Sequence, residues 1–288
     1  MNLGRFRVRP GHKVKLRRYD PADTRPFKNE EKAGDLLTRG IERLVALQER
    51  LYAQDRWAVL LIFQAMDAAG KDSAIKHVMS GLNPQGTQVF SFKRPSDEEL
   101  DHDYLWRTVK ALPERGRIGI FNRSYYEEVL VVRVHPEILA HQKLPPPLVT
   151  RDIWNERCED INAFEQYLAR NGTLILKFFL HMSKKEQRRR FLKRLDHPSK
   201  NWKFSAADLD ERSLWDDYMK AYEEALSRTS APHAPWFIVP ADHKWFTRVT
   251  IAELIIEAIE ALQLEFPRPS KAQLEELARA RKRLIAER

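Results

Sequence analysis

Five short runs of apolar residues divide this 288-residue chain, and each run is continuous rather than alternating with polar residues. Such runs are typical of strands that are buried on both faces of a sheet. Segments of helical length and spacing lie between them, including residues 34–54, 96–112 and 208–228. This alternation predicts a three-layer α/β fold in which helices cover both faces of a parallel sheet. The runs are residues 57–64, 87–92, 117–122, 173–181 and 235–241.

The pattern contains no internal repeat and no low-complexity tract, and the proline-rich stretches at residues 144–148 and 266–270 do not separate domains. We therefore expect one domain over residues 1–288. Ligands of parallel sheets bind at the carboxyl ends of the strands. The turns that follow Gln64 and Asn122 are the places where we expect a functional site.

Positive charge is concentrated in three segments of the chain. There are 50 Lys and Arg residues against 41 Asp and Glu, a net charge of +9. Residues 1–20 carry +6, residues 183–204 carry +7 and residues 268–288 carry +4, which leaves about −8 for the remainder. Such segments favour binding of a polyanion, although solvated helix faces would explain the same charge. We expect a basic arm at the N-terminus and a helical tail at the C-terminus.

Composition excludes several classes of protein. Hydrophobic residues make up 43% of the chain, which is too many for a disordered protein. Cys158 is the only cysteine, so neither an internal disulfide nor a cysteine-rich zinc site can form. No stretch approaches ~20 apolar residues, and no apolar segment follows the basic N-terminus, so we expect neither a membrane span nor a secretory signal. These features agree with a cytoplasmic protein.

The first turn has the context of a phosphate-binding loop. Residues 57–64 are followed by Gly70 and Lys71 and then by a helical segment. In such a loop, backbone N–H groups and a helix N-terminus bind the anion, and the lysine adds a positive charge. The standard pattern G-x-x-x-x-G-K-[ST] is only half met, because Ala65 replaces the first glycine and Asp72 follows the lysine. We expect phosphate contacts along the loop, at Ala68, Ala69, Gly70, Asp72 and Ser73.

Asp67 lies inside this loop, four residues before Lys71. A carboxylate that faces phosphate would be repelled unless a cation lay between them. Asp67 therefore predicts a bound Mg²⁺, which compensates for the missing hydroxyl after the lysine. The alternative is an ordinary polar turn in which Asp67 caps the following helix.

The second turn begins at Asn122, where folds of this kind often carry an aspartate that orients a metal. Arg123 follows and can bind a phosphate through two hydrogen bonds. Ser124 and Glu127 have the spacing of a capping box, so Glu127 either caps a helix or serves the site. Arg133, farther along the same predicted helix, either extends a basic channel or is solvated.

The basic segment at residues 183–204 is predicted to form a helix and a loop after the fourth apolar run. Arg190 and Arg194 are four residues apart and share one helix face. This arrangement indicates a mobile lid whose arginines stabilise charge on a transferring phosphoryl group. A nucleic-acid-binding helix is the rival interpretation. No helix-turn-helix or zinc pattern accompanies the segment, and we expect no nucleic-acid partner.

Four segments of the chain together resemble the family-2 polyphosphate kinases, and the similarity runs from about Val14 to about Glu265. The segments are residues 63–78, 91–100, 120–134 and 176–195. The resemblance implies a P-loop kinase-like fold, similar to thymidylate kinase, with a helical lid. It also implies phosphoryl transfer between inorganic polyphosphate and nucleotides with Mg²⁺ or Mn²⁺, and assembly as a dimer or tetramer.

The resemblance assigns catalytic roles to four residues. Asp67 matches a metal-organising carboxylate, and Lys71 matches the phosphate-loop lysine. Arg123 matches the arginine after the second strand end, and Arg190 matches a lid arginine that reaches the transferring phosphates.

Other residues carry over as substrate contacts. Asn122 together with Glu127 resembles the subgroup that accepts both AMP and ADP, and Arg133 and Arg188 match further basic positions. The resemblance thus implies a polyphosphate kinase that converts AMP to ADP and ADP to ATP by in-line transfer. An ATP-dependent nucleotide kinase and a non-catalytic polyanion-binding protein are the alternatives.

Overall fold

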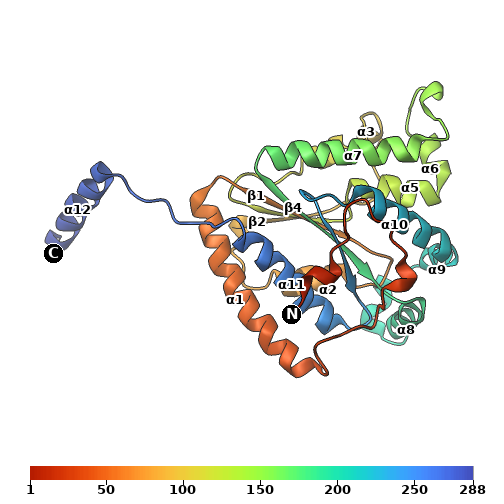
Figure 1. The fold of residues 1–288 in the computed structure, drawn as a ribbon, viewed down its shortest axis with the longest axis horizontal. Coiled ribbons are helices and arrows are strands. Elements are labelled where there is room, and N and C mark those ends of the chain that lie inside the picture. Colours follow the sequence, from red (N-terminus) through yellow and green to blue (C-terminus); the bar gives the residue numbers. More distant parts are fainter. Residues whose placement is uncertain (288) are drawn as a thin grey trace.

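The computed structural model describes residues 1–287 and has the α/β architecture expected from the sequence (Figure 1). Its five strands are all parallel and lie in the order β2-β3-β1-β4-β5. Each strand coincides with one of the five apolar runs, as predicted, but the edge strand at residues 87–91 is not buried on both faces. The strands are β1 (Ala58–Gln64), β2 (Thr87–Ser91), β3 (Ile118–Asn122), β4 (Thr173–His181) and β5 (Trp236–Pro240).

Helices cover both faces of this sheet. Alternate residues of each strand point to opposite faces, and their apolar side chains pack against the helices there. Leu61 and Phe63 of β1 pack toward α1 (Glu30–Gln54), α2 (Lys71–Val78) and α11 (Lys244–Glu260). Leu60 and Ile62 pack toward the other layer, α7 (Ile153–Arg170) and α10 (Trp215–Thr229). The two cores therefore meet at β1, which lies at the centre of the sheet between β3 and β4.

Shorter elements connect these layers. The remaining α-helices are α3 (Asp97–Leu100), α4 (Trp106–Val109), α5 (Val131–Val134), α6 (Pro136–Ala140), α8 (Lys184–Leu195), α9 (Ala207–Ser213) and α12 (Lys271–Ala286). The 3-10 helices are η1 (Leu3–Phe6), η2 (Leu16–Arg18), η3 (Pro84–Gly86), η4 (Tyr125–Val129), η5 (Pro146–Leu148) and η6 (Pro198–Lys203). No helix within residues 1–287 is both long enough and apolar enough to cross a membrane.

Two segments predicted as single helices are broken. Residues 96–112 form α3 and α4 with a turn between them, where the Asp103 carboxylate accepts a hydrogen bond from the Leu105 N–H at 2.9 Å. Residues 208–228 divide at Leu214 into α9 and α10. Acidic residues fill the first turn of α10, where they favour a helix N-terminus rather than a helix interior.

The N-terminal segment is not an extended basic arm. Phe6, Val8 and Leu16 are buried against the domain, and the Val8 N–H donates to the Trp236 carbonyl at 2.8 Å. The segment thus covers the open edge of β5, which would otherwise present unpaired backbone groups. The C-terminal tail forms the predicted helix, α12, which has no buried residue and lies apart from the body of the molecule (Figure 1).

Candidate active site

The predicted phosphate loop joins β1 to α2. Gly70 has φ +104°, a conformation that glycine adopts readily, and α2 begins at the next residue. The Lys71 Nζ donates to the Ala65 carbonyl at 2.8 Å, so the lysine side chain folds back across the loop. Burial lowers the pKa of Lys71, while the charge of Asp67 opposes that shift. Because Gly70 rather than Asp67 occupies the N-cap, the capping alternative for Asp67 is wrong.

The two predicted turns converge on one point. The Arg123 Nη2 lies 3.5 Å from the Asp67 Oδ1, and both side chains remain partly exposed. The Asn122 Nδ2 donates to the Asp72 Oδ1 at 2.6 Å and so joins the end of β3 to α2. The pairing of β1 with β3 brings these strand ends together. The two predicted turns therefore lie together at the carboxyl ends of β1 and β3, where parallel sheets bind ligands.

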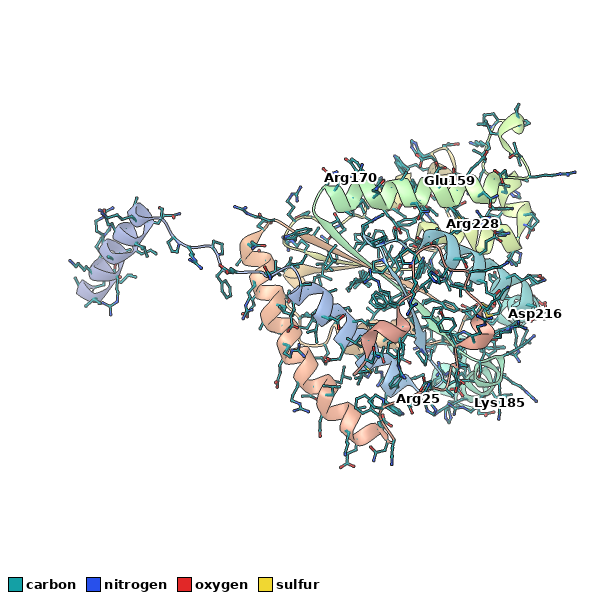
Figure 2. The ribbon with its side chains drawn as sticks, in the orientation of Figure 1. Arg25, Glu159, Arg170, Lys185, Asp216 and Arg228 are labelled. Atoms are coloured by element: carbon teal, nitrogen blue, oxygen red, sulfur yellow. The ribbon has the colours of Figure 1, made fainter. Side chains whose placement is uncertain are left out.

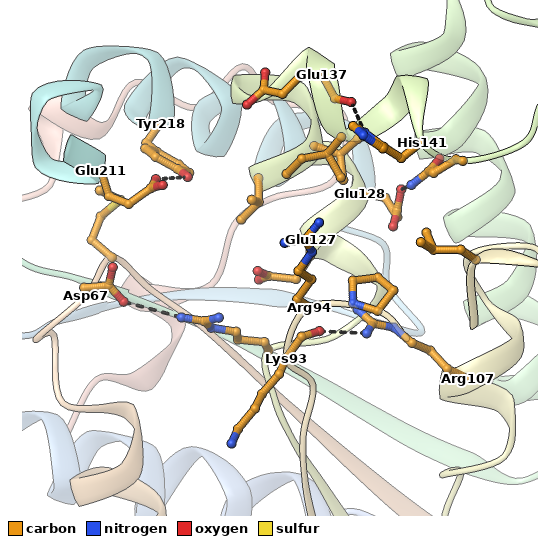
Figure 3. A pocket seen from close by; sticks show the side chains of 18 of the residues that line it. Asp67, Lys93, Arg94, Arg107, Glu127, Glu128, Glu137, His141, Glu211 and Tyr218 are labelled. Carbon is orange, nitrogen blue, oxygen red and sulfur yellow. Dashed lines mark hydrogen bonds and ion pairs between the residues drawn. The ribbon is translucent and has the colours of Figure 1, made fainter. Parts of the chain in front are cut away.

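Two cavities meet at this point, and Asp67, Lys93 and Arg123 line both of them. The first, which we call the carboxylate pocket, has a volume of about 500 Å³ (Figure 3). The second, which we call the cationic cleft, has a volume of about 1110 Å³. The carboxylate pocket is defined by Glu127, Glu128, Glu137, Glu211, Tyr218, Tyr222, Val131, Val132 and Ile138. The cationic cleft is defined by the phosphate loop and by Arg189, Arg190, Lys193, Arg194, Lys200, Lys203, Lys244 and Arg248.

Glu127 lies in the carboxylate pocket rather than in a capping box (Figure 3). The Ser124 Oγ accepts from the Tyr126 N–H at 3.1 Å, so the predicted reciprocal cap with Glu127 does not form. Burial raises the pKa of Glu127, although the nearby Arg123 and Lys71 charges counter the shift. The capping alternative for Glu127 is therefore wrong, and Glu127 lines the carboxylate pocket.

The opposite wall of the carboxylate pocket comes from the segment that follows the basic helix. Glu211 of α9 accepts a hydrogen bond from the Tyr218 Oη at 2.5 Å and lies 3.0 Å from His135 Nε2. Val131 and Ile138 add apolar surface beside these polar groups. Apolar walls with a few placed polar groups are typical of pockets that bind small organic molecules.

The cationic cleft holds several positive charges without acidic partners. Within residues 1–287, no ion pair of 4.0 Å or less involves Lys193, Lys244 or Arg248. Partial burial and the neighbouring charges of Arg190 and Arg248 lower the pKa of Lys244 to about 8. Cations that crowd together without counter-ions favour an anionic ligand with several charges.

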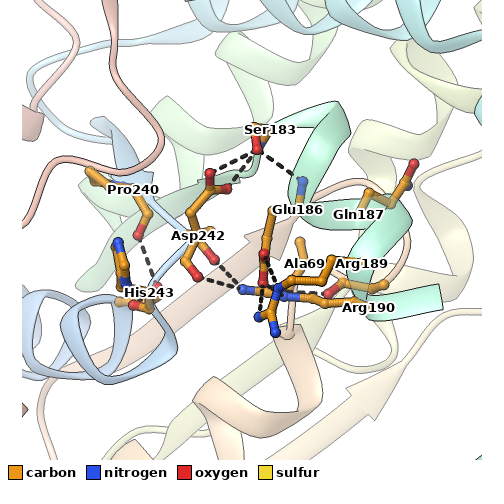
Figure 4. A network of polar contacts seen from close by, with 12 residues as sticks. Ala69, Ser183, Glu186, Gln187, Arg189, Arg190, Pro240, Asp242 and His243 are labelled. Atoms are coloured by element: carbon orange, nitrogen blue, oxygen red, sulfur yellow. Dashed lines mark hydrogen bonds and ion pairs between the residues drawn. The ribbon is translucent and has the colours of Figure 1, made fainter. Parts of the chain in front are cut away.

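Arg190 lines the cationic cleft, but its guanidinium is bound by other groups of the protein (Figure 4). Its Nη1 donates to the carbonyls of Ala68 and Ala69 at 3.0 and 2.7 Å. Its Nη2 donates to the carbonyls of Ala241 and Asp242, and its Nε donates to Glu186. All five N–H donors of the guanidinium are thus satisfied by the protein, and the side chain is 6% exposed. Arg190 thus joins the phosphate loop to the segment after β5.

Two of the predicted basic residues, Arg133 and Arg188, line neither cavity. Arg133 pairs with Glu224 of α10 at 2.6 Å and does not line the cationic cleft, so it does not extend a basic channel. Arg188 is exposed on α8, whereas Arg189 and Lys193 of the same helix face the cleft. Arg194 does line the cleft, where it lies 3.6 Å from Asp208. Helical geometry decides which basic side chains of α8 face the cleft, because successive residues of a helix point about 100° apart.

Several residues of the site were missed from the sequence. Lys93 follows β2, and Lys244 and Arg248 follow β5, so the strand-end rule would have found them if it had been applied to every strand. Glu137 and Glu211 carried no such signal, because they lie on short helices with ordinary surface patterns.

The residues present fit a magnesium ion that is shared with a substrate. Among residues 1–287, no group of three or more His, Cys, Asp or Glu side chains is placed to hold a metal. Mg²⁺ usually takes one or two carboxylates together with substrate phosphates rather than a cage made wholly of protein. Asp67 at the junction of the two cavities provides one such carboxylate.

The parallel sheet, the phosphate loop leading into α2 and the basic helix after β4 define a P-loop kinase-like protein. The model of the family "Polyphosphate kinase 2" matches residues 28–267. The chain therefore belongs to the polyphosphate kinase 2 family, and the predictions of the family, of a polyphosphate kinase and of the fold are confirmed.

Individual relatives agree with this assignment. The chain is 55% identical over 282 residues to the ADP-polyphosphate phosphotransferase of Rhodopseudomonas palustris, and 97% of each chain is covered. It is 44% identical over 271 residues to the AMP/ADP-polyphosphate phosphotransferase of Meiothermus ruber, with 94% of this chain and 97% of that one covered. The crystal structure of polyphosphate kinase 2 from Arthrobacter aurescens TC1 superposes with a TM-score of 0.86 at 40% identity, covering 95% and 94% of the two chains.

Proposed function

We propose that this chain transfers phosphoryl groups from inorganic polyphosphate to AMP and to ADP, and that it also catalyses the reverse reaction. The observation that carries the proposal is the meeting of two chemically different cavities at Asp67 and Arg123. The names of the relatives from Rhodopseudomonas palustris and Meiothermus ruber support these substrates.

Polyphosphate lies in the cationic cleft, since its charge requires many cations and no base-binding surface. The backbone of residues 68–73 and the side chains of Lys71 and Arg194 contact its phosphates. The nucleotide lies in the carboxylate pocket, with its base against Val131 and Ile138 and its phosphate toward Arg123. Donor and acceptor phosphates then meet at the shared junction.

Transfer breaks the P–O bond to the terminal unit of polyphosphate and forms a P–O bond to an oxygen of the nucleotide phosphate. The shortened polyphosphate leaves with the bonding electron pair, as an oxyanion. No strong base is required, because the attacking phosphate oxygen is already ionised near pH 7. Positioning and charge neutralisation provide most of the catalysis in such reactions, so Lys71 and Arg123 act by charge and by alignment.

Mg²⁺ or Mn²⁺, when bound by Asp67, would neutralise charge between the donor and acceptor phosphates. Arg190 takes a positioning role through the carbonyls of Ala68 and Ala69. Asn122 holds Asp72 at the edge of the loop, and Glu127 lines the nucleotide pocket near Arg123.

Incubation of the purified protein with AMP, Mg²⁺ and long-chain polyphosphate tests the proposal. Chromatography should show ADP and then ATP. A parallel reaction with ATP as the only donor separates the alternatives, since an ATP-dependent nucleotide kinase would form ADP there and would not use polyphosphate. A polyanion-binding protein would show salt-dependent binding of polyphosphate and no transfer in either reaction.

The cellular setting belongs to the same proposal. We expect a cytoplasmic homo-oligomer, a dimer or tetramer, without a nucleic-acid partner. Light scattering coupled to size-exclusion chromatography measures the assembly, and a gel-shift assay with duplex and single-stranded nucleic acid measures the binding.

A further inference from the structure

A fully buried ion pair lies behind the second turn of the active site. Glu165 of α7 and Lys177 of β4 are both 0% exposed, and the Lys177 Nζ lies 2.5 Å from the Glu165 Oε2. The ammonium also donates to the Tyr126 Oη at 2.8 Å and to the Thr229 carbonyl at 2.7 Å. All three protons of the lysine therefore have protein acceptors.

Two adjacent tyrosines complete this network. The Glu165 Oε1 accepts hydrogen bonds from the Tyr125 Oη and the Tyr126 Oη, both at 2.9 Å. Both tyrosines are at most 1% exposed. The Tyr126 ring also meets Trp236 edge to face, with the ring centroids 4.7 Å apart. Four side chains from η4, α7 and β4 are thus joined by direct hydrogen bonds in the core.

A contribution to protein stability does not explain why such a buried ion pair is present. Desolvation of two buried charges offsets much of their attraction, and apolar residues of similar volume often stabilise a protein equally well. A satisfied polar network does, however, impose one arrangement on the groups that it joins.

The groups held are those of the active-site turn. Tyr125 and Tyr126 lie in the chain between Arg123 and Glu127. Arg123 has φ +66°, an uncommon conformation for a residue with a side chain, which persists where the surroundings enforce it. The Ser124 Oγ, between them, accepts from the Tyr126 N–H and from the Gln64 Nε2 at 3.2 Å.

We propose that Glu165 and Lys177 are positioning residues for phosphoryl transfer. Through Tyr125 and Tyr126 they fix the backbone of the turn, so that Arg123 points toward Asp67 and Glu127 points into the carboxylate pocket. This inference rests on the proposed function and extends it to residues that touch no substrate.

Removal of the two tyrosine hydroxyls tests the inference. The Tyr125→Phe/Tyr126→Phe variant keeps both rings and should fold, yet kcat with AMP should fall about 10- to 100-fold, because a misplacement of ~1 Å can cost that much. The KM for polyphosphate should change less than about twofold, since the basic side chains of the cationic cleft other than Arg123 are untouched. A second variant, Glu165→Met/Lys177→Met, removes both charges together and should show the same separation of kcat from KM.

Gln48→Leu is the matched control. Gln48 is 2% exposed, and its amide exchanges hydrogen bonds with the Asn83 backbone beneath α1, away from both cavities. The Gln48→Leu substitution should lower the melting temperature and leave kcat unchanged. Folded tyrosine and Met variants with the kcat of the wild type would overturn the inference, as would an equal loss of kcat in Gln48→Leu. Absence of transfer in the wild type would instead refute the proposed function.

Discussion

The cationic cleft encloses about 1110 Å³ between the phosphate loop, α8 and α11, whereas the carboxylate pocket encloses about 500 Å³ and combines four glutamates with apolar side chains. The cleft presents lysines and arginines from segments far apart in the sequence, several of them without acidic partners. The pocket presents carboxylates, two tyrosines and aliphatic groups. Only a few residues, among them Asp67 and Arg123, belong to both.

We propose that the difference between the cavities corresponds to two kinds of substrate. A uniform polyanion has no feature except its repeated charge, and a surface of cations binds it without selecting one unit of the chain. A nucleotide has a base and a sugar, which need apolar contact and placed polar groups. In this proposal, phosphoryl transfer takes place at the junction, and the cavity on either side of it selects its substrate.

The largest effect should come from the junction itself. Asp67→Asn keeps the size of the side chain but removes its charge, so the metal loses its protein carboxylate and turnover should fall about 1000-fold or more. Rates of ADP formation from AMP and polyphosphate measure this loss. Near-normal turnover by the variant would show that the junction needs no carboxylate.

The phosphate-loop lysine should have the next largest effect. Lys71→Ala removes both a charge and the hydrogen bond to the Ala65 carbonyl, and kcat should fall about 100-fold while the KM for polyphosphate rises. Lys76→Ala, exposed on the same helix, is the control and should behave like the wild type. Equal effects of the two substitutions would mean that only the general charge of α2 matters.

Substitutions in the two cavities should separate the substrates. Lys193→Ala/Lys244→Ala should raise the KM for polyphosphate about tenfold and weaken its salt dependence, with the KM for AMP unchanged. Glu211→Gln should raise the KM for AMP several-fold and leave the KM for polyphosphate unchanged. Steady-state titration of each substrate at saturating levels of the other measures both constants.

Lys185→Ala controls for the loss of positive charge. Lys185 is exposed at the periphery of the molecule, on α8 but outside the cleft (Figure 2). The Lys185→Ala substitution should leave the KM for polyphosphate and the KM for AMP unchanged. A rise in the KM for AMP in the Lys193→Ala/Lys244→Ala variant would contradict the division of labour between the cavities.

The smallest predicted effect concerns pH. The pKa of Lys244 is about 8, so its ammonium is charged below that pH and becomes neutral as the pH rises through it. The KM for polyphosphate should therefore increase severalfold between pH 7 and pH 9. Lys244→Arg keeps the charge over this range and should flatten the increase. An unchanged slope in that variant would assign the pH dependence to another group.

Much of the fold follows from the sequence because its signals are local. Continuous apolar runs mark all five strands, and the rule for strand ends leads to Asp67 and Arg123. The breaks at residues 101–105 and at Leu214 depend on single turns within otherwise helical patterns. Near the N-terminus, apolar residues that alternate with basic ones are buried against the domain, whereas our prediction of a basic arm used only the charge of that segment.

The side-chain directions could not be predicted in the same way. Arg190 turns inward because four carbonyls from two distant loops converge on it, and its spacing along α8 would be the same if it pointed outward. Arg133 finds Glu224 about 90 residues later in the chain. The identity of such partners is a property of the assembled fold.

The most direct test of the account is whether both substrates bind at the same time. Calorimetric titration of Asp67→Asn with AMP, before and after saturation with long-chain polyphosphate, measures this in a protein that turns over too slowly to disturb the result. We predict that the affinity for AMP changes less than about threefold, because each substrate has its own cavity. Loss of AMP binding in the presence of polyphosphate would mean that the two compete for one site, and the account would be wrong.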